Sequence, residues 1–201
     1  MEQQDILSMT LPELQAAVQE LGEPKFRAKQ IFNWLHQKRV TDFSEMTTLS
    51  LPFRERLASD FCINRLKIAK RLASSVDDTV KYLYELPDGN YVETVCMQYH
   101  HGTSLCISTQ VGCRMGCRFC ASAIAGFVRN LTPAEMLLQI YETERAQNCK
   151  ISSLVLMGIG EPLDNFDNVL RFLQLLSDPN GYGMSLRHVT VSTCGVVPKI
   201  L

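Results

Sequence analysis

The sequence predicts a mixed α/β protein, in which a small all-α domain and a β-hairpin connector precede the N-terminal part of a β/α barrel. Three observations support this fold class. Apolar residues recur at helical spacing up to about residue 62, β-rich runs with a Pro-Asp-Gly-Asn turn follow, and short strands then alternate with amphipathic helices. We therefore expect three units, residues 1–62, 63–102 and 103–201.

The first unit carries helix signals. Thr10-Leu-Pro-Glu13 is a capping box with proline in the first turn, and apolar residues recur at helical spacing until Gly22. Two further helices are predicted at 26–38 and 52–61, and the first of these has lysines and arginines around its apolar face. Residues 1–62 are therefore predicted to form a helical domain.

The second unit has the pattern of antiparallel strands. β-rich runs occupy 67–73 and 79–86, and a Pro-Asp-Gly-Asn turn leads into a third run at 91–99. Within this run Glu93 lies on an otherwise mostly apolar side of the strand. An acid in that position is either exposed at an edge or placed there for chemistry.

The third unit has the order of a barrel. Strands are expected at 104–109, 152–157 and 188–192, and helices are expected to begin at the capping box Thr132-Pro-Ala-Glu135 and at Phe166. This βαβαβ pattern stops at Leu201, soon after the third strand, whereas a closed barrel needs several more units. We therefore expect a truncated sequence with an unpaired strand edge.

Composition limits the class of protein. The formal net charge is -1, so no overall field indicates nucleic acid, but residues 24–71 contain eleven Lys and Arg against four Asp and Glu. That excess suits either phosphate contacts or solvated helix faces. Eight cysteines are too few for a disulfide scaffold and indicate metal chemistry in a reducing compartment. Without an apolar leader or a membrane-length apolar run, we expect a cytoplasmic protein with no membrane association.

Three cysteines lie within eight residues on a Gly-rich loop after a predicted strand, and they are Cys113, Cys117 and Cys120. A structural zinc site usually takes four protein ligands, so three thiolates better suit a four-iron, four-sulfur cube with one open iron. The C-x3-C-x2-C spacing resembles the radical S-adenosylmethionine (SAM) signature, in which the open iron binds SAM. The zinc alternative needs a fourth ligand. The nearest candidates are Cys106, His100 and His101.

Two later loops carry candidate cofactor contacts. Gly158-Ile-Gly160-Glu161-Pro162 leaves the second predicted barrel strand at the end where barrels place reactive groups, and its acid and exposed backbone suit the SAM amino group. A Pro-terminated turn with a solvent-facing glutamate is the alternative. Ser192 and Thr193, after the third strand, offer hydroxyls for a cofactor carboxylate or ribose, or are ordinary polar residues at a strand end.

Several segments together resemble the RlmN/Cfr family of radical SAM adenosine methyltransferases. These are Tyr91-Val-Glu-Thr-Val95, Cys106-Ile-Ser-Thr-Gln-Val-Gly-Cys113, Cys117-Arg-Phe-Cys120-Ala, Asn130-Leu-Thr, Met157-Gly-Ile-Gly-Glu-Pro-Leu-Asp-Asn165 and Val191-Ser-Thr-Cys-Gly-Val-Val-Pro198. Pro162-Leu163 resembles the RlmN branch, which methylates adenine C2, rather than the Cfr branch, which methylates C8. A C8 methyltransferase and a zinc-stabilised RNA-binding module are the alternatives.

The resemblance implies a radical SAM barrel with a [4Fe-4S] cluster, and methylation of C2 of an adenosine in 23S rRNA and of the adenosine 3′ to the anticodon in some tRNAs. It also implies that residues 1–62 bind RNA, and we expect an electron donor such as flavodoxin and a monomeric state. In the family, one SAM methylates a protein cysteine. A second SAM, cleaved by the reduced cluster, yields a radical that converts this S-methyl group into the species that adds to C2.

The resemblance also implies roles for single residues. Cys113, Cys117 and Cys120 would ligate the cluster, and Gly160, Glu161 and Ser192 would contact SAM. Cys106 would resolve the protein–RNA adduct through a transient disulfide, and Glu93 would act as an acid–base carboxylate. A buried core thiol is the alternative for Cys106.

The methyl-carrying cysteine of the family corresponds to a position beyond Leu201. None of Cys62, Cys96, Cys149 and Cys194 occupies a matching position. We therefore expect that the 201-residue chain cannot complete methyl transfer alone.

Overall fold

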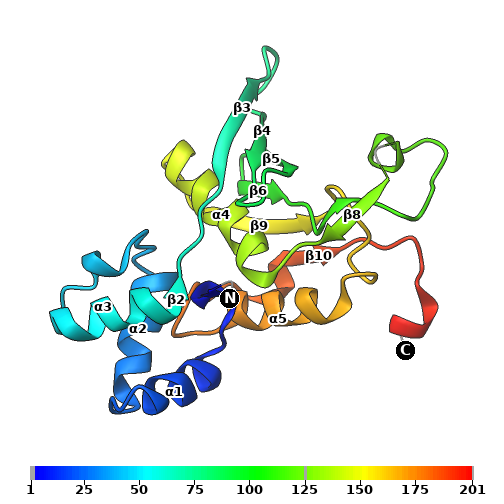
Figure 1. Cartoon of the computed structure of the whole chain (residues 1–201). Helices are drawn as coiled ribbons and strands as arrows, with labels where there is room; N and C mark the ends of the chain where they lie inside the picture. The colour runs from blue at the N-terminus through cyan, green and yellow to red at the C-terminus, as the bar shows by residue number, and fades with distance from the viewer. Residues whose placement is uncertain (1–2, 125, 201) are drawn as a thin grey trace.

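A computed structural model describes residues 3–124 and 126–200 of the chain. Helices gather at the N-terminal end, and a mixed sheet with two long helices forms the rest of the molecule (Figure 1). The predicted mixed α/β class is confirmed. No helix in the described part of the chain has both the length and the apolar character needed to cross a bilayer.

The N-terminal part contains the three predicted helices. Its elements are β1 (Gln4–Asp5), η1 (Ile6–Ser8), α1 (Leu11–Glu20), α2 (Phe26–His36), η2 (Phe43–Glu45), α3 (Leu51–Asp60) and β2 (Phe61–Cys62). The predicted capping box begins α1, because the backbone N–H of Thr10 donates to the Glu13 carboxylate at 2.8 Å. Parallel pairing of β1 with β2 brings the two ends of this part together.

One sheet contains six strands in the order β10-β9-β6-β5-β4-β3. Its strands are β3 (Lys67–Ala73), β4 (Val80–Glu85), β5 (Tyr91–Tyr99), β6 (Gly102–Cys106), β9 (Ile151–Leu156) and β10 (Val189–Val191). Strands β3 to β6 pair antiparallel, whereas β6, β9 and β10 pair parallel. The strands of the expected connector, residues 63–102, therefore belong to the same sheet as those of the expected barrel part.

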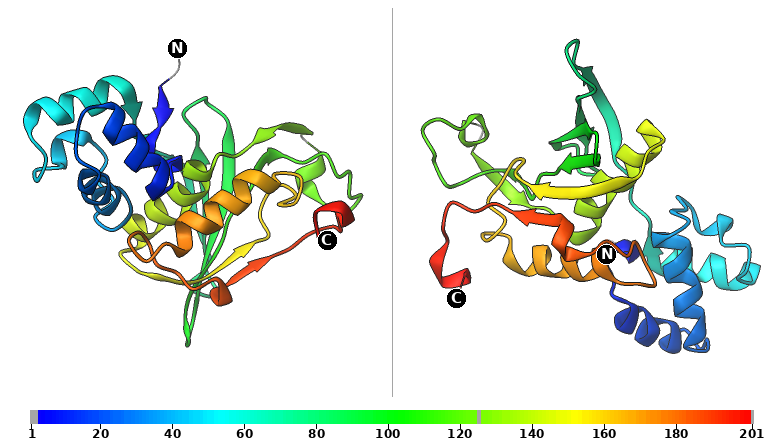
Figure 2. Two further views of the ribbon diagram at one scale, coloured as in Figure 1. Left: turned by 90° about the horizontal axis from the view of Figure 1, so that it is seen from below. Right: turned by 180° about the vertical axis from the view of Figure 1, so that it is seen from behind.

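Helices α4 (Pro133–Gln147) and α5 (Phe166–Ser177) connect the parallel strands. The predicted capping box begins α4, where Thr132 and Glu135 exchange hydrogen bonds of 2.9 and 3.2 Å. Most of α4 is buried between the sheet on one side and η1 and α5 on the other. Two views at right angles place both helices against the same sheet (Figure 2).

The two faces of the sheet differ in cover. Alternate residues of β5, namely Val92, Thr94 and Cys96, are buried, and the Thr94 hydroxyl donates to Gln139 of α4 at 2.8 Å. The opposite face, with Glu93 and Val95, is only half-buried. One face therefore forms the core with the helices, and the other is only partly covered.

One buried and one exposed polar contact fix the N-terminal helices to α4 and α5. His36 of α2 meets the Tyr141 hydroxyl of α4 at 2.9 Å, with both residues buried. Arg171 of α5 forms an ion pair with Glu13 of α1 at 2.5 Å. Because these contacts come from four helices, the N-terminal part and the sheet part are joined by a packed interface.

Burial of His36 predicts a pH-dependent stability. Desolvation lowers the pKa of His36 to about 4, so the folded protein keeps it neutral at pH values where the unfolded chain protonates it. Stability should therefore fall as pH drops from about 6.5 to about 4, by up to about 3 kcal/mol from this residue. Urea unfolding of wild type and His36→Gln across this range should show a flatter profile for the variant, and parallel profiles would contradict the assignment.

Candidate cofactor site at the ends of the parallel strands

The three-cysteine loop is held at its base by a short strand pair. Strands β7 (Gln110–Gly112) and β8 (Phe127–Asn130) pair antiparallel, and the N–H of Cys113 donates to the carbonyl of Gly126 at 3.1 Å. The sequence patterns did not predict β8. Its pairing fixes both ends of the loop, so the loop leaves and rejoins the fold at defined positions.

Cys113, Cys117 and Cys120 are half-buried on this loop, and the N–H of Cys120 bonds to the carbonyl of Cys117 at 3.0 Å. Among the residues described, no three His, Cys, Asp or Glu side chains converge in a ready-made metal geometry. Three thiols on one short, anchored loop nevertheless fit a cluster with an open iron in the chemistry of their donors, and such sites commonly close only around the metal.

The structure weakens the zinc alternative. His100 and His101 lie in the turn that precedes β6, whereas the cysteine loop follows the other end of that strand. A five-residue strand is about 16 Å long, so neither imidazole is placed to complete a four-ligand site with the loop. Of the three candidate fourth ligands, Cys106 alone lies at the same end of β6 as the loop.

Arg114 connects the cysteine loop to the loop that follows β9. Its Nε lies 2.9 Å from a carboxylate oxygen of Asp164, and its guanidinium lies over the Phe127 ring at 3.9 Å. An arginine next to the first cysteine thus holds the two candidate cofactor loops together.

Gly160 can adopt its position only without a side chain. Its φ is +108°, and a Cβ there would lie 2.6 Å from Cβ of Gln110. The fully buried Gln110 accepts the N–H of Glu161 at 2.8 Å and donates to Asn130 and Asp164, both at 2.8 Å. Sequence reasoning assigned no role to Gln110, although a polar residue next to a Gly-rich cysteine loop was a usable signal.

Glu161 is buried and does not face solvent. Its carboxylate accepts the N–H of Leu163 at 2.9 Å and the N–H of Cys194 at 2.7 Å. Burial alone would raise the pKa of Glu161, but these backbone donors outweigh burial and hold it below its usual range. The carboxylate is therefore charged at neutral pH. The alternative of a solvent-facing glutamate in this turn is wrong.

Ser192 and Thr193 follow β10 and are exposed. Their loop reaches the loop after β9, because the N–H of Cys194 donates to the Glu161 carboxylate at 2.7 Å, and Asp164 of that loop pairs with Arg114 of the cysteine loop. The structure thus brings together the cysteine loop, the loop with Gly160 and Glu161, and the loop with Ser192. Contact of any of these residues with SAM stays a prediction.

Glu93 and Cys106 lie on the half-buried face of the sheet. Val95 pairs directly with Cys106, so Glu93, two residues before Val95, is its diagonal neighbour at about 7–8 Å. Lys81 pairs with Val95 on the other side, and its ammonium lies 2.6 Å from the Glu93 carboxylate. Sequence reasoning missed Lys81, because its proximity follows from strand register. Burial raises the pKa of the Cys106 thiol, which is therefore protonated at neutral pH.

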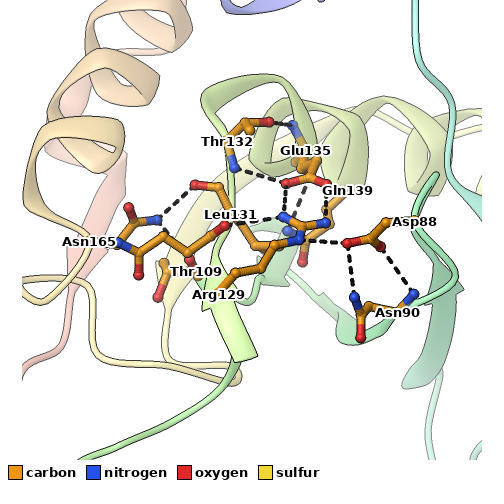
Figure 3. Close-up of polar contacts among 10 residues, drawn as sticks. Asp88, Asn90, Thr109, Arg129, Leu131, Thr132, Glu135, Gln139 and Asn165 are labelled. Atoms are coloured by element: carbon orange, nitrogen blue, oxygen red, sulfur yellow. Dashed lines mark hydrogen bonds and ion pairs between the residues drawn. The ribbon is translucent and has the colours of Figure 1, made fainter. Parts of the chain in front are cut away.

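Arg129 fixes β8 to the rest of the fold (Figure 3). Its guanidinium forms two bonds of 2.8 and 2.7 Å to Glu135 of α4 and one of 2.6 Å to Asp88 in the turn before β5. Nearby, the amide of Asn165 donates to the carbonyls of Thr109 and Leu131, both at 2.8 Å. These contacts make the strand pair below the cysteine loop rigid.

Comparisons with known proteins agree with this geometry. Residues 4–63 match the model of the ribosomal RNA large subunit methyltransferase N-terminal domain, and residues 107–201 match that of the radical SAM superfamily. A solved radical SAM methyltransferase from Sphaerobacter thermophilus is 35% identical and superimposes with a TM-score of 0.90, over 98% of this chain and 59% of its own.

Two curated proteins, both named probable dual-specificity RNA methyltransferase RlmN, are similar over nearly the whole chain. The one from Lachnoclostridium phytofermentans is 53% identical over 98% of this chain and 55% of its own length. The one from Clostridium novyi is 48% identical over 98% of this chain and 57% of its own. The chain thus spans about half the length of the curated relatives it matches.

Gly112 offers a test of the anchored loop. Its φ is +71°, and a Cβ there would lie 1.7 Å from the Gly126 carbonyl oxygen, so Gly112→Ala should separate β7 from β8. We expect a loss of more than about 2 kcal/mol of stability and reduced iron uptake in anaerobic reconstitution. The control, Gly116→Ala, has a φ of +67° but open space around the new Cβ. Equal iron content in both variants would refute the anchoring role.

Proposed function

Because the chain belongs to the RlmN/Cfr family of radical SAM methyltransferases, we propose that it provides the cluster and SAM site for methylation of an adenine in RNA. The observation that carries this proposal is the meeting of three loops at the ends of the parallel strands. Arg114 links the cysteine loop to Asp164, and Glu161 links the loop after β9 to Cys194. The half-buried face with Glu93 and Cys106 adjoins them.

The family uses a [4Fe-4S] cluster and SAM, and the bound cluster supplies the electron that cleaves SAM. In this chain Cys113, Cys117 and Cys120 would hold the cluster. The backbone around Gly160 and the hydroxyl of Ser192 would bind SAM and orient it. Arg114 and Glu161 keep these groups in place, so that the reacting atoms meet in a defined geometry.

Glu93 and Cys106 suit the target-base end of the site. Lys81 keeps the Glu93 carboxylate paired, and this carboxylate is the acid–base group that we assign to the adenine. Cys106 is a protonated thiol next to it, which we assign to release of the protein–RNA adduct through a transient disulfide. Both groups lie on the face of β5 and β6 that the helices leave uncovered.

RNA is the substrate class that we propose, with C2 of adenosine in 23S rRNA and in tRNA next to the anticodon as its targets. The match of residues 4–63 and the names of the relatives support RNA, and Pro162-Leu163 favours C2 over C8. We further propose a helical RNA-binding domain over 1–62, a connector over 63–102 and a partial barrel over 103–201. A cytoplasmic location, a flavodoxin-type electron donor and a monomeric state stay predictions.

A basic cleft is the surface on which we place the RNA backbone. The cleft has a volume of about 840 Å³ and lies between the end of α2 and the turn after α4. Five cations line it against two acids, Glu45 and Glu144, and the cations are Lys38, Arg39, Arg65, Arg145 and Lys150. Arg39 pairs with Glu144, whereas Lys38 and Lys150 are exposed and can meet phosphates.

Replacement of one predicted ligand tests the cluster. Cys117→Ala should lose the EPR signal of the reduced cluster and the release of 5′-deoxyadenosine from SAM after anaerobic reconstitution, whereas Cys149→Ala, with its thiol at the far end of β9, should keep both. Colourless wild-type protein with stoichiometric zinc would favour the RNA-binding zinc module and overturn the proposal.

Removal of the exposed lysines tests the RNA surface. Lys38→Gln with Lys150→Gln should weaken RNA binding and reduce the slope of log affinity against log salt by about 1.5. The matched control is Lys67→Gln with Lys70→Gln, two exposed lysines on β3 away from the cleft. Equal slopes in the two double variants would contradict this placement. In a form of the protein that completes methyl transfer, locating the methyl group on the adenine would separate C2 from C8.

A further inference from the structure

We propose that Glu161 is a positioning residue whose carboxylate holds the loop after β10 against the loop after β9, and so sets the place of Ser192 and Thr193. This inference rests on the proposed function only in naming these hydroxyls as SAM contacts. The contact between the Glu161 carboxylate and the loop after β10 involves only residues of this chain. It gives Glu161 a structural role in addition to its predicted contact with SAM, which stays a prediction.

The contacts of the carboxylate support this role. One oxygen accepts the N–H of Leu163, two residues later in its own loop, and the other accepts the N–H of Cys194 from the next loop. The Thr193 hydroxyl and the Cys194 thiol also interact with it. Only 4% of Glu161 is exposed, so its charge is used inside the protein. Hydrogen bonds from backbone N–H groups to a carboxylate are among the stronger ones in proteins.

The loop after β10 has few other contacts that could fix its position. Strand β10 has three residues and lies at an edge of the sheet, with β9 as its partner there. From Val191 to Cys194 the residues are exposed, so packing contributes little to their position. A short edge strand with an exposed continuation is prone to fraying. A bond from the Cys194 N–H to a buried charge therefore fixes a segment that pairing leaves free.

Glu161 is itself held from the other side. Its N–H donates to Gln110, whose amide also bonds to Asp164, and Asp164 pairs with Arg114 beside Cys113. A continuous set of polar contacts thus runs from the cysteine loop to the loop with Ser192. These contacts fix the two loops relative to each other even when no cofactor is bound.

Hydrogen exchange in the absence of cluster and SAM tests the inference. Gln has the size of Glu but one acceptor oxygen, so Glu161→Gln cannot serve both N–H groups as the carboxylate does. The amide of Cys194 should exchange about tenfold faster or more in the variant, with a smaller change at Leu163. The control is Glu20→Gln, an exposed change at the end of α1, which should leave both amides unchanged.

SAM affinity of the reconstituted protein separates the two roles of Glu161. If the residue acts through the loop, Glu161→Gln and Ser192→Ala should weaken SAM binding in a non-additive way. Unchanged exchange at Cys194 in Glu161→Gln, with weaker SAM binding or without it, would overturn the inference. If Glu161→Gln fails to fold by circular dichroism, Glu161→Asp, which is too short to reach both donors, replaces it with the same expected exchange.

The two proposals fail in different ways. A wild-type protein that takes up neither cluster nor SAM would sink the proposed function and leave the exchange result standing. If the wild-type protein takes up both the cluster and SAM, and exchange at Cys194 is unchanged in Glu161→Gln, the positioning role of Glu161 is refuted and the proposed function stands.

Discussion

The buried amide of Gln110 is the contact on which the arrangement of the site depends. It accepts from the backbone of Glu161 and donates to Asn130 and Asp164, so one side chain ties β7 to β8 and to the loop after β9. A buried amide that lost any of these partners would leave a polar group unsatisfied, at a cost of about 1–3 kcal/mol. The cofactor loops are therefore built on a base in which Gln110 has its hydrogen bonds made, and their functional groups extend from it.

The two faces of the sheet have different roles: one packs against the helices and stabilises the fold, and the other carries candidate functional residues. On the covered face, Tyr84 and Thr94 bond to Thr143 and Gln139 of α4, and apolar residues fill the space between. On the other face, register places Lys81, Val95 and Cys106 in one row across three strands. Because neighbouring residues of a strand point to opposite faces, each strand serves both purposes at once. The glycines at the strand ends then allow the loops to approach closely.

Local patterns predicted much of the fold, and they failed where distant residues meet. The capping boxes at Thr10 and Thr132 were readable because all their partners lie within four residues. Strand β8 was missed because Phe127–Asn130 is too short to show a period and forms only through β7. The cysteine spacing marked the site, whereas the pairing of Lys81 with Glu93 and of Glu161 with Cys194 depends on register and loop closure, which no single segment encodes.

The partial burial of Cys106 has a consequence for the reactivity of its thiol. Burial keeps its sulfur protonated, and a protonated thiol reacts slowly with peroxide or with alkylating metabolites. The residue is nevertheless only partly buried, so a reaction partner that arrives on the uncovered face can still reach it. Such a thiol resists oxidation and alkylation better than a thiolate, and it becomes a strong nucleophile only when a base removes its proton. Low reactivity of the resting thiol would be an advantage in a site that handles radicals, as we propose for this one.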